Sequence, residues 1–106
     1  MSYNHVALIG LGLISSSIAL ALKRNQSSVR ITGTSRSSTT RSKAEKLNFC
    51  EVYNEINETV RDADLIILCV PVGAMASVVK EMVPFIKPGA ILTDVGSVKV
   101  EVISQV

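Results

Sequence analysis

Short apolar runs alternate with longer amphipathic stretches along the chain. The run at residues 64–70, DLIILCV, is almost uninterrupted, which is typical of a central strand of a parallel sheet that is buried on both faces. Shorter runs bounded by glycine, proline or polar residues have the length and composition of further strands. The pattern therefore predicts strands at residues 5–9, 29–34, 51–53, 64–70 and 90–94.

The stretches between these runs carry apolar residues at helical spacing. The clearest case is residues 74–86, where apolar side chains recur at positions i, i+3, i+4, i+7, i+8 and i+11. At residues 39–48 we expect a short helix that packs through Ala44 and Leu47. The pattern predicts helices at residues 13–24, 39–48, 55–61 and 74–86, and the start of another at 98–106.

The alternation of strands and helices defines the fold class. It predicts an α/β protein with one domain over residues 1–106, built on a doubly wound parallel sheet with helices on both faces. We expect about five strands in the order 3-2-1-4-5. Ligands bind such sheets outside the carboxyl ends of the strands, where the order reverses between strands one and four. The segments that follow these strand ends are GLGLIS, GTSRS, VPVGA and DVGSVK.

Composition narrows the class of protein. Of 106 residues, 47% are hydrophobic and 19% are charged, which supports one folded core. No apolar run reaches the roughly 18–20 residues of a membrane span, and the N-terminus lacks the basic segment of a secretory signal. We therefore expect a cytoplasmic protein without a membrane partner.

Cysteine and histidine usage argues against a metal site. Cys50 and Cys69 lack the spacing of metal ligands, and we expect them to be small buried hydrophobic residues in a reducing compartment. His5 is the chain's one histidine, which excludes a multi-histidine metal site. It starts the first strand, away from the strand ends that bind ligands, so we expect it to be structural.

Charge is segregated along the chain. Residues 23–46 hold seven basic residues and one acidic residue, a net charge of +6, whereas residues 47–106 hold four basic and eight acidic residues, a net charge of −4. This segregation indicates a local anionic partner and gives no reason to expect nucleic-acid binding. A solvated helix face would explain the basic stretch equally well, and charge alone leaves the two interpretations open.

The segment GLGLIS lies between a predicted strand and a predicted helix, where a dinucleotide-binding turn is found. Gly10 would allow the tight turn, and Gly12 would let a pyrophosphate approach the backbone. We expect Leu13, Ile14 and Ser15, at the start of the helix, to hold the pyrophosphate there. Ser15 stands where a third glycine is usual, and its hydroxyl would bind either locally or to phosphate. The alternative is a strand-to-helix turn without a ligand.

The segment GTSRS follows the second predicted strand. NAD-binding units usually place an acidic residue here to hold the ribose hydroxyls, but the first acidic residue of this chain is Glu45. Hydroxyl groups and a guanidinium would instead hold a 2′-phosphate. Ser35 and Arg36 therefore favour NADP over NAD, with Ser37, Thr40 and Arg41 as weaker candidates. The alternative is an ordinary polar loop and a site that accepts either cofactor.

Two further segments follow strand ends on the other side of the switch point. Val70, Pro71 and Val72 end the buried run, and we expect them beside the cofactor, although Pro71 would also serve as a plain strand terminator. Ser97, in DVGSVK, is a good helix N-cap and would place a hydroxyl near the nicotinamide.

Three motifs together carry a resemblance to a known family. The segments VALIGLGLISSSIA, ADLIILCVPVGAM and KPGAILTDVGSVK resemble the N-terminal, Rossmann-type domain of the prephenate/arogenate (cyclohexadienyl) dehydrogenases. The resemblance covers essentially all 106 residues. It implies an NAD- or NADP-dependent oxidoreductase of tyrosine biosynthesis, which oxidises and decarboxylates prephenate or arogenate and whose intact form is a homodimer. It also implies that Ser97 lies in the active site near the substrate hydroxyl.

The chain departs from the family pattern in two ways. The family usually reads GLGLIGGS at the turn, whereas Ser15 and Ser16 stand here. The family's catalytic histidine and substrate-binding arginine follow the last motif, so we expect the chain by itself to be inactive. Other interpretations are the cofactor domain of another hydroxyacid or pyrroline-carboxylate-type dehydrogenase, and a non-catalytic nucleotide-sensing module.

Overall fold

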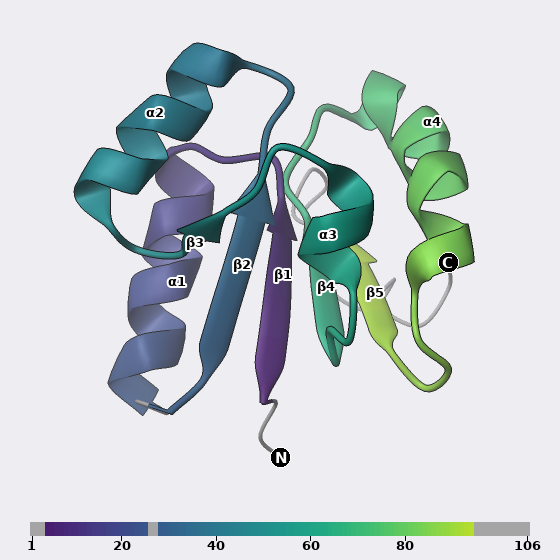
Figure 1. The fold of residues 1–106 in the computed structure, drawn as a ribbon, viewed down its shortest axis with the longest axis horizontal. Helices are drawn as coiled ribbons and strands as arrows, with labels where there is room; N and C mark the ends of the chain where they lie inside the picture. Colours follow the sequence, from purple (N-terminus) through teal and green to yellow (C-terminus); the bar gives the residue numbers. More distant parts are fainter. Residues whose placement is uncertain (1–3, 26–27, 95–106) are drawn as a thin grey trace.

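The sheet has the predicted architecture. The computed structural model describes residues 4–25 and 28–94, and in this part of the chain five strands form one sheet in the order β3-β2-β1-β4-β5 (Figure 1). Every neighbouring pair is parallel. The strands are β1 (His5–Ile9), β2 (Arg30–Thr34), β3 (Glu51–Val52), β4 (Leu65–Leu68) and β5 (Ile91–Asp94).

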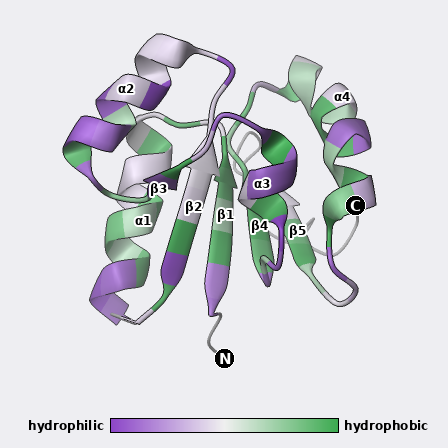
Figure 2. Cartoon of the chain, viewed as in Figure 1, coloured by the Kyte–Doolittle hydropathy of each residue, from purple (hydrophilic) through white to green (hydrophobic). Residues whose placement is uncertain are grey.

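Helices pack on both faces of the sheet. They are α1 (Leu13–Asn25), α2 (Ser38–Leu47), α3 (Ile56–Val60) and α4 (Val72–Met82), followed by a 3-10 turn, η1 (Val83–Phe85). One core lies between the sheet and the α1–α2 layer, which contributes Ala19 and Ala44. The other lies beneath α3 and α4, which contribute Val60, Val78 and Met82. The most hydrophobic segments lie along the central strands, inside both layers (Figure 2).

Proline sets two boundaries that differ from the prediction. The run at 64–70 forms a strand only to Leu68, and Pro71 is the residue that precedes α4 rather than the end of the ladder. Helix α4 therefore begins two residues earlier than predicted. It ends at Met82 instead of residue 86, because Pro84 has no amide hydrogen to donate and its ring crowds the preceding turn of an α-helix. The chain continues as η1.

The prediction for helix 39–48 was correct for one of its two packing residues. Ala44 is buried in the core, but Leu47 is 70% exposed. Leu47 ends α2, and Asn48 leaves the helix in the left-handed conformation with φ of 55°. The chain then turns toward β3, and Phe49 is the apolar side chain that enters the core in place of Leu47.

The amino ends of the central strands are fixed by polar contacts. The Asp64 carboxylate accepts hydrogen bonds from the Asn4 and His5 amides, at 2.9 Å each, and from Lys87 Nζ. His5 is buried, and its Nε2 donates to Thr32 Oγ1 at 2.8 Å, since that hydroxyl donates in turn to the Thr59 carbonyl. Burial lowers the pKa of His5. His5 thus joins three elements at the end of the sheet opposite the predicted site.

Two predictions concern residues 95–106, which the structure does not describe. The predicted helix at 98–106 and Ser97 lie outside the described residues. Within the described ranges, no helix is long and apolar enough to cross a membrane. In the same ranges, no group of three or more His, Cys, Asp or Glu side chains is arranged to hold a metal ion.

Candidate functional site

The turn between β1 and α1 depends on Gly10. This residue has φ of +97°, which side chains other than glycine rarely adopt. A β-carbon here would lie 2.7 Å from the Cys69 carbonyl oxygen of the neighbouring strand end. The Gly10 amide donates to the Thr34 carbonyl at 2.8 Å, which ties the turn to the end of β2. Gly10 therefore makes the tight turn, as predicted.

Gly12 differs from Gly10 in that no atom of residues 4–25 or 28–94 crowds it. A β-carbon there would meet nothing within 4 Å, and the residue is exposed at the start of α1. The first amide to bond within the helix belongs to Ser16, which donates to the Gly12 carbonyl at 3.0 Å, so the preceding amides of residues 13–15 have no acceptor four residues back. No acidic residue lies in the first turn. The open surface at Gly12 therefore carries the positive end of a helix dipole.

Ser15 makes a local bond, one of the two roles considered for it. It is 1% exposed, and its hydroxyl donates to the Gly10 carbonyl at 2.5 Å. The serine therefore lies buried between the helix and the strand, where a glycine is usual, and its hydrogen bond stabilises the turn. This arrangement keeps the strand-to-helix geometry despite the missing third glycine.

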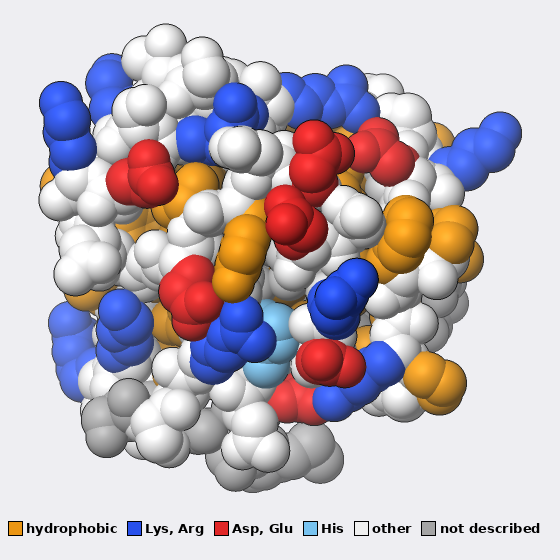
Figure 3. Space-filling model, viewed as in Figure 1, with side chains coloured by type: hydrophobic (Ala, Val, Ile, Leu, Met, Phe, Trp, Pro, Cys, Tyr) orange, Lys and Arg blue, Asp and Glu red, His pale blue; other side chains and the backbone are white. Residues whose placement is uncertain are grey.

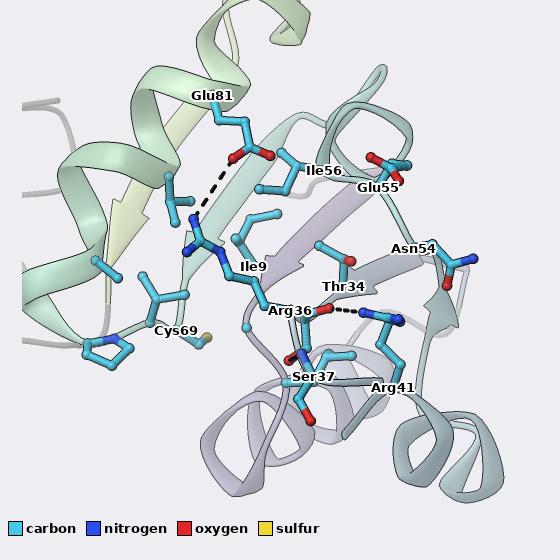
Figure 4. A pocket seen from close by; sticks show the side chains of 17 residues that line it. Ile9, Thr34, Arg36, Ser37, Arg41, Asn54, Glu55, Ile56, Cys69 and Glu81 are labelled. Carbon is cyan, nitrogen blue, oxygen red and sulfur yellow. Dashed lines mark hydrogen bonds and ion pairs between the residues drawn. The ribbon is translucent and has the colours of Figure 1, made fainter. Parts of the chain in front are cut away.

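A cavity of about 490 Å³ opens at the carboxyl ends of β1, β2 and β4, where the strand order reverses (Figure 4). One wall is the β2–α2 loop, and the facing wall is the end of β4 together with α4. The segment between β3 and α3 closes a third side. The residues that line the cavity are Ile9, Gly10, Leu11, Thr34, Ser35, Arg36, Ser37, Arg41, Asn54, Glu55, Ile56, Cys69, Val70, Pro71, Ala74, Val78 and Glu81.

The β2–α2 loop is held by its own polar groups. The Ser37 hydroxyl accepts from the Thr40 amide at 3.2 Å and caps α2, and the Ser35 hydroxyl accepts from the Ser37 amide at 3.3 Å. Arg41 Nη1 donates to the Ser35 carbonyl at 2.5 Å (Figure 4). Both serine hydroxyls retain a hydrogen to donate. The loop is therefore preformed, with Arg41 as its anchor.

Arg36 extends from this loop across the cavity. Its Nη2 lies 3.9 Å from Glu81 Oε1 on α4, and the two side chains are 69% and 55% exposed (Figure 4). An exposed ion pair at this distance is weak. The Arg36 guanidinium therefore remains available to an anionic group that enters the cavity. On the face shown in Figure 3, acidic side chains lie near α3, and several basic side chains lie over α1 and α2.

The two cysteines are less buried than expected. Both are free and half-buried, and Cys69 lines the cavity. Burial raises the pKa of the Cys69 thiol, and it raises the pKa of Cys50 to about 11. Both thiols are therefore protonated at neutral pH, which makes them poor nucleophiles.

The structure brings together about half of the predicted binding residues. Gly10, Ser35, Arg36, Ser37, Val70 and Pro71 line the cavity. Gly12, Ile14 and Val72 are exposed outside its lining, Ser15 is buried beneath the turn, and Leu13 starts α1.

Other lining residues were not predicted from the sequence. Asn54, Glu55 and Ile56 come from the segment before α3. Ala74, Val78 and Glu81 share one face of α4, at helical spacing. The spacing within α4 was visible in the sequence, but the direction in which this face points depends on how the helix packs.

The chain is similar in sequence and in structure to known dehydrogenases. Residues 18–106 match a family model described as "Prephenate dehydrogenase, nucleotide-binding domain". Cyclohexadienyl dehydrogenase of Zymomonas mobilis is 45% identical over 102 residues, which are 95% of this chain and 35% of that protein.

Two solved structures show the same fold. Arogenate dehydrogenase of Synechocystis matches with a TM-score of 0.79 and 31% identity, over 92% of this chain and 34% of the other. Prephenate dehydrogenase from A. aeolicus, in complex with hydroxyphenyl propionate and NAD+, matches with a TM-score of 0.78 and 24% identity, over 89% of this chain and 34% of the other. The chain thus spans about a third of the length of each of these relatives. By its sequence match and its Rossmann-type sheet, it belongs to the family of prephenate dehydrogenase nucleotide-binding domains.

Proposed function

We propose that the cavity and the start of α1 bind a nicotinamide dinucleotide. The observation that carries this proposal is the open backbone at Gly12, beside helical amides and a cavity of about 490 Å³ that contains Arg36 and Arg41. Amides and guanidinium groups suit the pyrophosphate and the adenosine end of such a molecule. The family description names a nucleotide-binding domain, and the structural relative from A. aeolicus contains NAD+.

Within this proposal, NADP is preferred over NAD. The end of β2 carries no acidic residue, and Ser35, Arg36 and Ser37 line the cavity there. A 2′-phosphate would accept hydrogen bonds from the serine hydroxyls and pair with the Arg36 guanidinium, which forms a weak, exposed ion pair with Glu81 among the described residues. Arg41 contributes by fixing the loop through the Ser35 carbonyl.

We extend the proposal to the activity of the whole protein. The chain supplies the cofactor-binding domain, over residues 1–106, of a homodimeric prephenate or arogenate dehydrogenase of tyrosine biosynthesis. The relatives that carry the names cyclohexadienyl, arogenate and prephenate dehydrogenase support this assignment. When bound, the cofactor supplies a hydride acceptor for the oxidation of the substrate. Ser97 is proposed to contact the substrate hydroxyl.

The test of cofactor selection is the variant Arg36→Ala, titrated by calorimetry with NADP and with NAD. Loss of one charged hydrogen-bonding group should weaken NADP binding by about 1–3 kcal/mol and leave NAD binding nearly unchanged. Arg24→Ala is the matched control, because Arg24 is an exposed arginine in the last turn of α1, outside the cavity. Equal losses for the two cofactors, or an equal loss with the control, would overturn the assignment of Arg36.

A further inference from the structure

An ion pair joins two walls of the cavity that are distant in sequence. Arg36 lies in the β2–α2 loop and Glu81 in the last turn of α4, and their closest atoms are 3.9 Å apart (Figure 4). Both residues line the cavity. The pair therefore places a carboxylate beside the guanidinium that would receive a 2′-phosphate.

The two arginines of the cavity differ in how they are held. Arg41 is half-buried and donates to the Ser35 carbonyl, so its position is fixed by the loop itself. Arg36 is 69% exposed, and Glu81 is the carboxylate with which it pairs among the described residues. A phosphate arriving at Arg36 must either displace Glu81 or share the guanidinium with it. Sharing brings a second negative charge close to the phosphate, which is unfavourable.

We propose that Glu81 is a specificity-determining residue that competes with the 2′-phosphate of NADP for Arg36. This inference rests on the proposed function and deepens it. NAD carries an uncharged hydroxyl at the same position, so it binds without disturbing the ion pair. Glu81 therefore weakens the binding of NADP more than that of NAD. It lowers the ratio of NADP to NAD affinity that Ser35 and Arg36 raise.

The effect of Glu81 follows from the exposure of the pair. Exposed ion pairs contribute about 0.2–1 kcal/mol, which corresponds to a change of about 1.4- to fivefold in affinity. We therefore expect Glu81→Gln, which keeps the shape of the side chain and removes its charge, to tighten NADP binding by up to about fivefold. NAD binding should change by clearly less, and the gain for NADP should shrink as salt is added.

The experiment compares four chains by calorimetric titration with NADP and with NAD: the unaltered chain, Glu81→Gln, Glu55→Gln and the double variant Arg36→Ala/Glu81→Gln. Glu55 is the matched control, because it is a second carboxylate of the same cavity that forms no ion pair with Arg36 in the described residues. The expected result is a higher ratio of NADP to NAD affinity in Glu81→Gln than in Glu55→Gln, and no such gain in the double variant.

Three results would overturn the inference. The first is a Glu81→Gln chain whose NADP and NAD affinities rise equally or stay unchanged. The second is a gain that persists in full without Arg36, because the carboxylate would then act on the phosphate directly. The third is an unaltered chain that binds neither cofactor, in which case the proposed function fails as well. The first two leave the proposed function intact, so the two failures are distinguishable.

Discussion

Alanine substitutions at Gly10 and Gly12 should separate the folding of the turn from its binding. At Gly10, φ is +97° and a β-carbon would lie 2.7 Å from the Cys69 carbonyl oxygen. The backbone conformation costs a residue with a β-carbon about 1–2 kcal/mol. Forcing a methyl against a backbone atom adds about 1–3 kcal/mol, because neither strand end can move freely. Gly10→Ala should therefore destabilise the fold by about 2–5 kcal/mol.

Gly12→Ala should leave stability nearly unchanged. A β-carbon there meets no atom within 4 Å, and φ lies outside the left-handed region. Alanine reduces the conformational freedom of the unfolded chain, which stabilises by about 0.4–1 kcal/mol, but it is a poorer residue than glycine before a helix. The net change should lie within about 0.5 kcal/mol. Binding should weaken by about 1–3 kcal/mol, because the added methyl occupies the surface that the pyrophosphate approaches.

The assay combines urea unfolding, which gives the free energy of unfolding, with calorimetric titration of NADP. For a domain of this size, each kcal/mol lost by Gly10→Ala should lower Tm by about 4–8 °C. The reasoning is refuted if Gly12→Ala retains full NADP affinity, since the open surface would then have no role in binding. It is also refuted if Gly10→Ala is as stable as the unaltered chain.

Two further predictions concern stability. Ser15→Gly, which restores the usual third glycine, should destabilise by about 1–3 kcal/mol in urea unfolding, because it removes the bond to the Gly10 carbonyl and places glycine in a helix; a stabilised variant would contradict this role. Burial lowers the pKa of His5 from 6.5, so the folded state binds fewer protons than the unfolded state. The contribution of His5 to the free energy of unfolding should be fully present above about pH 6.5 and be lost as the pH drops through the folded pKa of His5. The contribution of Asp64 is lost at lower pH, below the unfolded pKa of 3.8 for that carboxyl. Unfolding measured at pH 7.5 and 5.5 should show this fall, and His5→Gln should remove it; equal slopes in both chains would contradict the assignment.

The topology of the fold was predictable because periodicity and chain order determine it. A continuous apolar run such as 64–70 is typical of a strand covered on both faces, and right-handed crossovers leave few arrangements for five parallel strands. Element ends were less predictable. Helix α4 ends before Pro84, although the apolar pattern continues to residue 86. Leu47 has the spacing of a buried helical residue, but it is exposed at the end of α2.

The candidate site was predictable where a single local motif makes it. Gly10 and the GTSRS loop adjoin strand ends, so the order of the strands alone brought them together. Glu81 and Asn54 reach the cavity through the packing of α4 and of the segment before α3, which no short sequence pattern encodes. The hydrogen bond from Arg41 to the Ser35 carbonyl could not be predicted from the sequence either, because it depends on how α2 packs against the loop.

Calorimetric titration of the chain with NADP, followed by NAD, tests the central claim most directly. We predict that both cofactors bind and that NADP binds more tightly, because the surface at Gly12 receives a pyrophosphate and Arg36 receives the 2′-phosphate. Tighter binding of NAD would contradict the assignment of the GTSRS loop. Binding of neither cofactor would contradict the claim that this turn and cavity form a nucleotide site.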